Sequence, residues 1–309
     1  MSEWWQHLRG DPMNWLLDYD NPSVRYFTLT DVVERPRESP AVIEARAAIQ
    51  SSRTVQRIFA KQNPEGWWQS PDQIYRPKYK ATVWQLMILA ELGVSGQDER
   101  IARACEFIFE RGMTAEGDFS HRPDKSRTIP YCLPGNVVCF LLSFGYGDDP
   151  RTRLAVERLA QTSLEQGWRC RHYHHQACLW GCLRTLRAFA AIPLEGRTND
   201  IEEVIERGAN LFLEQDFAAL GPEWHRYGFP LFYQCDLLFG LQVMAELGYA
   251  KHPGLEPALA LVLAKQDGDG RWILERTFNG RMQTNIERKG LPSKWVTLNA
   301  LRVTKSAYD

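Results

Sequence analysis

Two kinds of helical pattern alternate along the chain. In the first kind apolar residues occupy most positions, and a helix that is apolar on most faces is buried on most faces. These segments are Ser23–Val33, Lys80–Gly93, Gly135–Phe144, His175–Ala191, Phe232–Gly248 and Lys294–Val303. In the second kind an apolar stripe shares the segment with charged residues, as in half-exposed helices: Ala41–Lys61, Asp98–Arg111, Pro150–Gln166, Asp200–Gln215 and Pro253–Lys265. The alternation predicts an inner and an outer ring of helices.

Short glycine-aromatic segments recur between the two kinds of helix. Their glycines are Gly66, Gly117, Gly167, Gly221 and Gly270, at spacings of 51, 50, 54 and 49 residues. Glycine adopts positive φ where a helix ends, and the following aromatic ring can fold back over the helix ends. We therefore interpret these aromatic residues as packing between repeats. The pattern predicts an all-α protein, a single (α/α)6 toroid of about six hairpins over residues 1–309, with an N-terminal outer helix (Glu3–Leu17) before the repeats of residues 21–309.

Composition and charge exclude several classes of protein. The 309 residues include 37 Lys and Arg against 38 Asp and Glu, a formal charge of −1, whereas nucleic-acid binding usually leaves a basic footprint. No uncharged apolar stretch approaches 18 residues, so we expect no transmembrane helix, although peripheral membrane contact stays open. The start of the chain has no basic and apolar signal regions, and seven cysteines favour reduced thiols or metal ligands over disulfides. These features predict a cytoplasmic protein.

The repeats resemble a known superfamily. Gln62-Asn-Pro-Glu-Gly66-Trp-Trp68, followed by the apolar helix Thr82–Gly93, is similar to repeats of the squalene–hopene cyclase and protein-prenyltransferase β-subunit superfamily. The resemblance extends from about Asn21 to Lys305 and looks closest to short bacterial squalene-cyclase-like proteins with a single toroid. It implies an α/α toroid, and a hydrophobic, isoprenoid-like small molecule as the partner of the central cavity.

Two catalytic motifs of that superfamily are missing. The Asp-x-Asp-Asp motif, whose middle Asp protonates an alkene or epoxide, does not occur. The nearest stretches are Asp18-Tyr-Asp20-Asn21, Asp148-Asp149-Pro150 and Asp267-Gly-Asp269-Gly270, which we interpret as turns and caps. The zinc ligands of the prenyltransferase β subunit have no counterpart either, because Cys235-Asp236 has the wrong order and spacing. The resemblance therefore predicts the fold more specifically than the reaction.

The N-termini of the inner helices are expected to converge on one rim, where polar and aromatic residues gather. Asp236 enters an otherwise apolar helix, and burial would raise its pKa and suit it to act as the catalytic acid. The alternative is a carboxylate that caps the helix or pairs with a cation. The candidate substrate-binding residues share this rim: Tyr75, Lys78, Tyr79, Trp84, Phe232, Tyr233, Lys294 and Trp295.

Each of these substrate-binding assignments has a structural alternative. Aromatic walls would suit a polyprenyl chain or a carbocation, but aromatic residues of an inner helix are more often packing. Lys78 and Lys294 could hold a diphosphate or carboxylate, or could pair with Asp236, Glu275 or Glu287.

A zinc site is the predicted cofactor site. The segment from Cys170 to Cys178 contains two cysteines and three histidines, and thiolate with imidazole is the donor set that zinc prefers. The predicted ligands are Cys132, Cys170, His175 and Cys178, with Cys132 supplied by the neighbouring inner helix and with His174 as an alternative to His175. The alternative is that the cysteines are small buried apolar residues.

These observations predict a toroid that binds, and acts on, a hydrophobic small molecule, with a zinc ion at its rim. Two alternatives stay open: a non-catalytic toroid that binds a lipid or a peptide, and a carbohydrate-active enzyme, since glycosidases and lyases also use α/α toroids.

Overall fold

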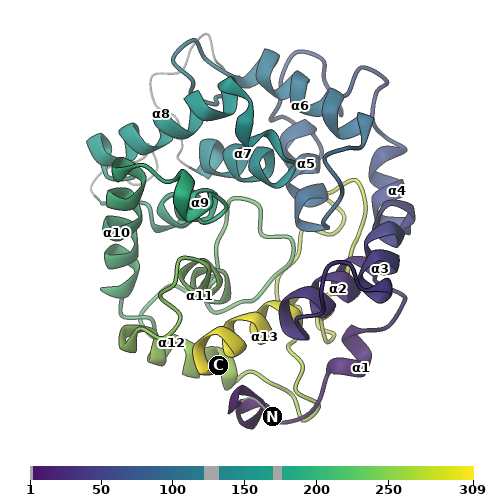
Figure 1. Cartoon of the computed structure of the whole chain (residues 1–309), viewed down its shortest axis with the longest axis vertical. Helices are drawn as coiled ribbons and strands as arrows, with labels where there is room; N and C mark the ends of the chain where they lie inside the picture. Colours follow the sequence, from purple (N-terminus) through teal and green to yellow (C-terminus); the bar gives the residue numbers. More distant parts are fainter. Residues whose placement is uncertain (1–2, 122–131, 170–175) are drawn as a thin grey trace.

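Two concentric rings of helices form the protein, in a computed structural model that describes residues 3–121, 132–169 and 176–309. The inner ring (Figure 1) consists of α2 (Pro22–Phe27), α5 (Thr82–Glu91), α7 (Cys132–Ser143), α9 (Leu179–Ala190), α11 (Leu237–Glu246) and α13 (Lys294–Tyr308). The outer ring consists of α3 (Pro40–Ser51), α4 (Arg53–Phe59), α6 (Glu99–Gly112), α8 (Pro150–Gln166), α10 (Asn199–Leu213) and α12 (Glu256–Leu263). No strand occurs in the described ranges, where the β-type contacts are isolated bridges. The predicted all-α toroid is confirmed.

The last inner helix closes the ring on the first. α13 packs against both α11 and α2, and it also contacts the N-terminal 3-10 helix Glu3–His7. A π-helical turn, Thr28–Val32, continues α2 and contacts α13 as well. Within the part of the chain that the structure describes, no helix is long and apolar enough to cross a membrane.

Two of the glycine-aromatic turns join neighbouring helices by the same pair of hydrogen bonds. The indole of Trp68 donates to the carbonyl of Ile58 at 2.9 Å, and its backbone N–H donates to Thr82 Oγ1 at 3.0 Å. Trp272 repeats the pattern with the carbonyl of Val262 at 2.8 Å and Thr297 Oγ1 at 3.0 Å. Each indole thus ties an outer helix to the next inner helix, which confirms that these rings are packing between repeats.

Four of the five turn glycines have positive φ, as predicted, and one shows why glycine is required. Gly66 has a φ of 101°, and a Cβ at this position would lie 2.6 Å from the backbone of Arg103 in α6. The fifth and weakest turn departs from the pattern, since Gly221 is not among the glycines of positive φ.

Several predicted helix boundaries were wrong. The expected helix Ala41–Lys61 is two helices, α3 and α4, because the backbone is extended at Ser52 between them. The expected helix Glu3–Leu17 is a 3-10 helix, Glu3–His7, and a short helix α1, Met13–Leu16, because Gly10 and Pro12 interrupt the pattern. The expected helix Phe232–Gly248 begins only at Leu237. Phe232 has a φ of 54° and therefore lies in the preceding loop rather than in a helix.

Glycine also allows two inner helices to approach each other closely. A Cβ on Gly135 of α7 would lie 2.7 Å from the backbone carbonyl of Arg184 in α9. This contact fixes the position of Arg184 relative to α7, since any larger residue would separate the two helices.

Candidate functional site

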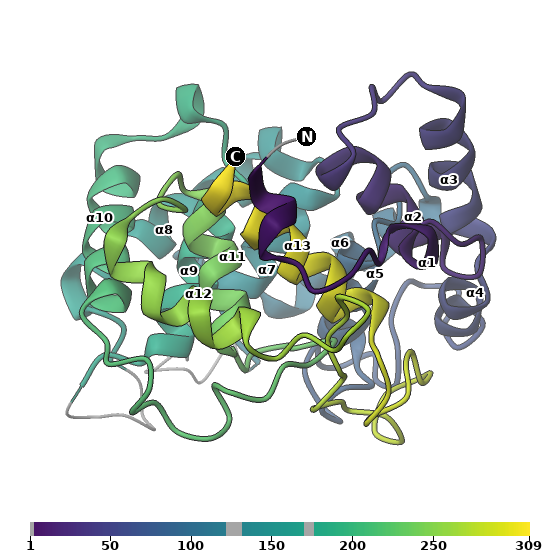
Figure 2. The ribbon, with the colours of Figure 1, turned by 90° about the horizontal axis from the view of Figure 1, so that it is seen from below.

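The two ends of the toroid differ in what fills them. Long connections, from α10 to α11 and from α12 to α13, gather on the face where the inner helices begin (Figure 2). We call this face the N-terminal rim and the opposite one the C-terminal rim. The sequence placed the candidate site at the N-terminal rim.

The N-terminal rim holds a packed aromatic cluster. Trp84 is 2% exposed and lies edge-on against Phe232, with ring centroids 5.4 Å apart. Tyr79 packs on the same two rings, at 5.3 and 5.1 Å, and its hydroxyl lies 3.3 Å from that of Tyr233. Burial raises the pKa of Tyr79 far above its ordinary value, so the phenol stays protonated. The structure brings these predicted residues together, and their rings fill the space between them.

Tyr75 and Lys78 lie at the edge of the cluster. The backbone carbonyl of Tyr75 accepts the indole N–H of Trp84 at 2.7 Å. Lys78 is exposed, and its Nζ lies 4.8 Å above the ring of Tyr233. The ammonium group therefore covers the cluster from outside by a cation–π contact.

Asp236 is the N-terminal cap of α11. It is 1% exposed, and its two oxygens accept the backbone N–H of Phe239 at 2.9 Å and that of Gly228 at 3.0 Å. Arg276 Nη2 lies 3.7 Å from Asp236 Oδ2. The contacts match the capping alternative, and they use both oxygens on the protein itself.

Burial raises the pKa of Asp236 from 3.8 to about 6, although Arg276 and the two backbone N–H groups lower it in part. The folded state therefore binds the proton more tightly than the unfolded chain. The stability that this group contributes is full below about pH 4 and is lost as the pH rises through about 6. Asn does not titrate, so Asp236→Asn should not lose this stability. We therefore expect the unfolding free energy of Asp236→Asn, measured relative to that of wild type, to rise by about 3 kcal/mol between pH 4 and pH 7.

Urea denaturation of both proteins across this pH range measures the change. The exposed Asp200 provides the control, because Asp200→Asn should follow the wild-type curve closely. A stability difference between Asp236→Asn and wild type that does not vary with pH would contradict the buried-carboxyl interpretation.

Lys294 and Trp295 are buried at the start of α13, and both have protein partners. The ammonium group of Lys294 pairs with Asp20 and lies 3.9 Å from Asp18 Oδ2, rather than pairing with the acids considered from the sequence. The ring of Trp295 stacks on Phe229 with centroids 4.2 Å apart.

The predicted zinc ligands are only partly described. Cys132 is the first residue of α7, and Cys178 is the N-cap of α9, which packs side by side with α7. Cys170 and His175 lie outside the described residues. Within the described ranges, no three or more His, Cys, Asp or Glu side chains are grouped so as to hold a metal ion.

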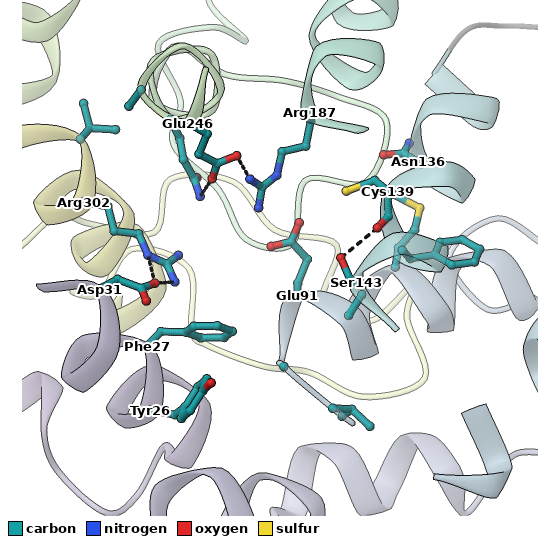
Figure 3. A pocket seen from close by; sticks show the side chains of 18 of the residues that line it. Tyr26, Phe27, Asp31, Glu91, Asn136, Cys139, Ser143, Arg187, Glu246 and Arg302 are labelled. Atoms are coloured by element: carbon teal, nitrogen blue, oxygen red, sulfur yellow. Dashed lines mark hydrogen bonds and ion pairs between the residues drawn. The ribbon is translucent and has the colours of Figure 1, made fainter. Parts of the chain in front are cut away.

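A cavity of about 580 Å³ lies in the centre of the toroid toward the C-terminal rim. Every inner helix contributes to its wall (Figure 3). The described aromatic and apolar lining includes Tyr26, Phe27, Met87, Phe140 and Val303. Five arginines and three carboxylates of the described residues also line it, leaving a net charge of +2: Arg37, Arg46, Arg184, Arg187, Arg302, Asp31, Glu91 and Glu246.

Ion pairs connect neighbouring helices at the mouth of this cavity. Arg187 of α9 pairs with Glu246 of α11, and Arg302 of α13 donates from Nε to Asp31 at 2.9 Å (Figure 3). Glu91 points into the cavity and makes no ion pair within the described part of the chain. Arg187 also lies in the last turn of α9, where the negative dipole end of the helix favours a cation.

Polar residues continue below the mouth into the buried part of the wall. Gln242 lies one helical turn before Glu246, and Arg184 lies one turn before Arg187. Gln242, Arg184 and Asn136 are between 3% and 8% exposed, whereas Glu246 and Glu91 are exposed. The cavity therefore has a charged mouth and a buried floor that is also partly polar.

None of the described residues predicted to be catalytic, substrate-binding or metal-ligating lines this cavity. The sequence hypothesis did not find the cavity, because it placed the site at the N-terminal ends of the inner helices. A signal was present in the sequence: Arg184 with Arg187, and Gln242 with Glu246, place polar groups one turn apart in helices that are otherwise apolar.

Comparisons with known proteins concern the fold. No protein-family model matches the chain, and no curated protein matches it in sequence. Among solved structures it matches type II terpene cyclase MstE from Scytonema in a complex with merosterolic acid A, with 13% identity, a TM-score of 0.34, and 85% of this chain and 96% of that chain covered. This is the kind of protein that the sequence resembles.

Two further solved structures are similar at comparable levels. A crystal structure of a protein from Actinoplanes has 16% identity and a TM-score of 0.44, with 94% of this chain and 90% of that chain covered. The ligand-free MstE structure has 15% identity and a TM-score of 0.32, with 84% and 97% covered. At these identities and TM-scores, we transfer no activity and no site residue from those proteins to this chain.

Proposed function

We propose that this protein binds a small amphipathic molecule in its central cavity, which the molecule enters at the C-terminal rim. The observation that carries the proposal is the lining of the cavity, which combines aromatic and aliphatic side chains with charged ones from α5, α9, α11 and α13. Small-molecule sites in proteins commonly have volumes of about 300 to 1,000 Å³ and combine an apolar lining with a few polar groups.

The cavity also helps to choose among the functions that the sequence left open. An isoprenoid-like molecule, as the resemblance implies, suits the walls formed by Phe27, Met87 and Phe140 if it carries a polar end. A wholly hydrocarbon ligand would leave the buried Arg184, which makes no ion pair in the described part of the chain, without an anionic partner, and this costs free energy. A cavity surrounded by six inner helices of the described chain suits a small molecule better than a peptide.

Isothermal titration calorimetry with geraniol and geranic acid tests the proposal, because the two probes share a hydrocarbon chain and differ at one end. We expect one molecule to bind per chain, with a negative heat-capacity change from the burial of apolar surface. The absence of binding for both probes would contradict the proposed function.

A zinc ion bound by Cys132, Cys170, His175 and Cys178 remains a separate proposal, supported by the donor types in the sequence and by the packing of α7 on α9. Elemental analysis of protein purified without chelators should find about one zinc per chain, and less in Cys178→Ser. Folded protein that contains no metal would overturn it.

A further inference from the structure

Arg184 is a buried arginine on the floor of the central cavity. Arg184 belongs to α9 and lines the cavity, and the residue is 3% exposed. Arginine keeps its charge at every ordinary pH, and a buried charge is costly unless a group of opposite charge compensates it. Among the residues that the structure describes, no carboxylate lies within ion-pair distance of Arg184.

The neighbouring carboxylate is already engaged elsewhere. Asp236 lies close enough for Arg184 to lower its pKa in part. Its oxygens, however, accept two backbone N–H groups, and one of them faces Arg276. Asp236 therefore does not form a direct ion pair with Arg184.

Protein contacts hold the guanidinium of Arg184 in place, but they do not use all of its hydrogen-bond donors. Its Cζ lies 4.1 Å from the ring centroid of Phe239, and Nη2 donates to the carbonyl of Gln234 at 2.7 Å. Nε is buried and has no hydrogen-bond partner in the described part of the protein. A planar guanidinium that keeps an N–H group without a partner can still donate to a carboxylate or a phosphate.

Two amides lie in the same buried wall. Asn136 of α7 and Gln242 of α11 flank Arg184 of α9, because these three helices are neighbours in the inner ring. Asn136 donates from Nδ2 to the carbonyl of Cys132 at 2.6 Å, and Gln242 donates from Nε2 to Glu246 at 3.3 Å. Both side chains are thus oriented by the protein beside the one cation of the described floor.

We propose that Arg184 binds the anionic end of the ligand, a carboxylate or a phosphate ester, on the floor of the central cavity. The inference rests on the proposed function and adds the chemical class of the ligand to it. The anion supplies the counterion that the protein does not, while the hydrocarbon part extends along Met87 and Phe140 toward the mouth. Arg184 is then the residue that makes the cavity bind acids more tightly than alcohols.

The comparison of geranic acid with geraniol tests this assignment, and geranyl phosphate shows which of the two anions is preferred. Because hydrogen bonds to charged groups are stronger than neutral ones, we expect wild-type protein to bind an anionic probe at least about tenfold more tightly than the alcohol. In Arg184→Met the acid and the alcohol should bind about equally, with geraniol affinity unchanged. Arg184→Lys should keep part of the preference.

A matched substitution controls for the loss of a buried arginine. Arg197 has a side chain that is 7% exposed, donates to the carbonyl of Ile192 at 3.0 Å, and does not line the cavity. Arg197→Met should therefore retain the wild-type preference for the acid. Urea denaturation of each variant without ligand confirms that it is folded before binding is measured.

The possible outcomes separate the two proposals. Equal binding of acid and alcohol by wild-type protein would overturn the role of Arg184 and leave the proposed function standing. A preference for the acid that survives in Arg184→Met would also overturn it, because the anion would then bind elsewhere. Failure of all three probes to bind would overturn both proposals. If Arg184→Met does not fold, the preference of wild-type protein for the acid and its partial loss in Arg184→Lys still test the role of Arg184.

Discussion

Replacement of Trp84 with alanine is expected to lower the free energy of unfolding by about 3 to 5 kcal/mol, the cost that accompanies loss of a large buried aromatic side chain. Trp84 is 2% exposed and contacts Tyr75, Tyr79 and Phe232, with ring centroids 4.7 to 5.4 Å apart. Alanine would leave a cavity within this cluster and a carbonyl without its indole donor. Urea denaturation measures the loss.

Trp67 provides the matched control for this prediction. It is half-buried, and its indole N–H donates to the side chain of Glu65 at 3.3 Å on the outside of the protein. Trp67→Ala should cost clearly less than Trp84→Ala. If Trp84 instead formed the wall of a ligand site, as the sequence allowed, its replacement would weaken ligand binding with little loss of stability, and that result would contradict our interpretation.

Obstruction of the central cavity is expected to weaken binding of the geranyl probes by at least about tenfold, or about 1.4 kcal/mol. Ala90 of α5 and Ala245 of α11 line the cavity and are half-buried near its mouth. An indole at either position occupies space that the ligand needs, so Ala90→Trp, Ala245→Trp and the double variant should bind progressively less. Calorimetric titration of each variant gives the affinities.

The matched control places the same residue on the outer ring. Ala102 of α6 is half-buried and does not line the central cavity. Ala102→Trp should bind both probes as wild type does. Undiminished binding by the double variant Ala90→Trp with Ala245→Trp would show that the ligand occupies another place.

The ring architecture was predictable because it depends on short-range features that recur. Gly66 with Trp68 and Gly270 with Trp272 are visible in the sequence, and in the structure the tryptophan of each pair joins the preceding outer helix to the next inner helix. Helix burial was also visible, since α5 and α11 are apolar on most faces. A repeat needs only its neighbours to bury its apolar face, so local pattern and global fold agree.

Boundaries near the N-terminal rim were less predictable, because tertiary contacts override the local pattern there. The sequence predicted an apolar helix from Phe232 to Gly248, yet the backbone has positive φ at Phe232 and α11 begins only at Leu237. The aromatic ring of Phe232 is then buried against Tyr79 and Phe278, which are far away in the sequence. Periodicity alone contains no information about such partners.

The candidate site could not be located from residue types alone. The sequence showed many aromatic and ionisable residues near the helix N-termini, but not that the rings would fill the space among themselves. Asp236 illustrates the difficulty, because a carboxylate that enters an apolar helix can be an acid or a cap, and its two backbone hydrogen bonds appear only in the folded protein. The cavity-lining arginines come from α3, α9, α13 and the turn before α3, which are far apart in the sequence and are brought together by closure of the ring.

A crystal structure of the complex with geranic acid would show where the ligand binds and whether Arg184 contacts its anionic end. We expect one ligand in the central cavity, with its carboxylate within hydrogen-bond distance of Arg184 and its hydrocarbon chain against Met87 and Phe140. A ligand bound at the N-terminal rim beside Lys78 and Tyr233, with the central cavity free of it, would contradict the account.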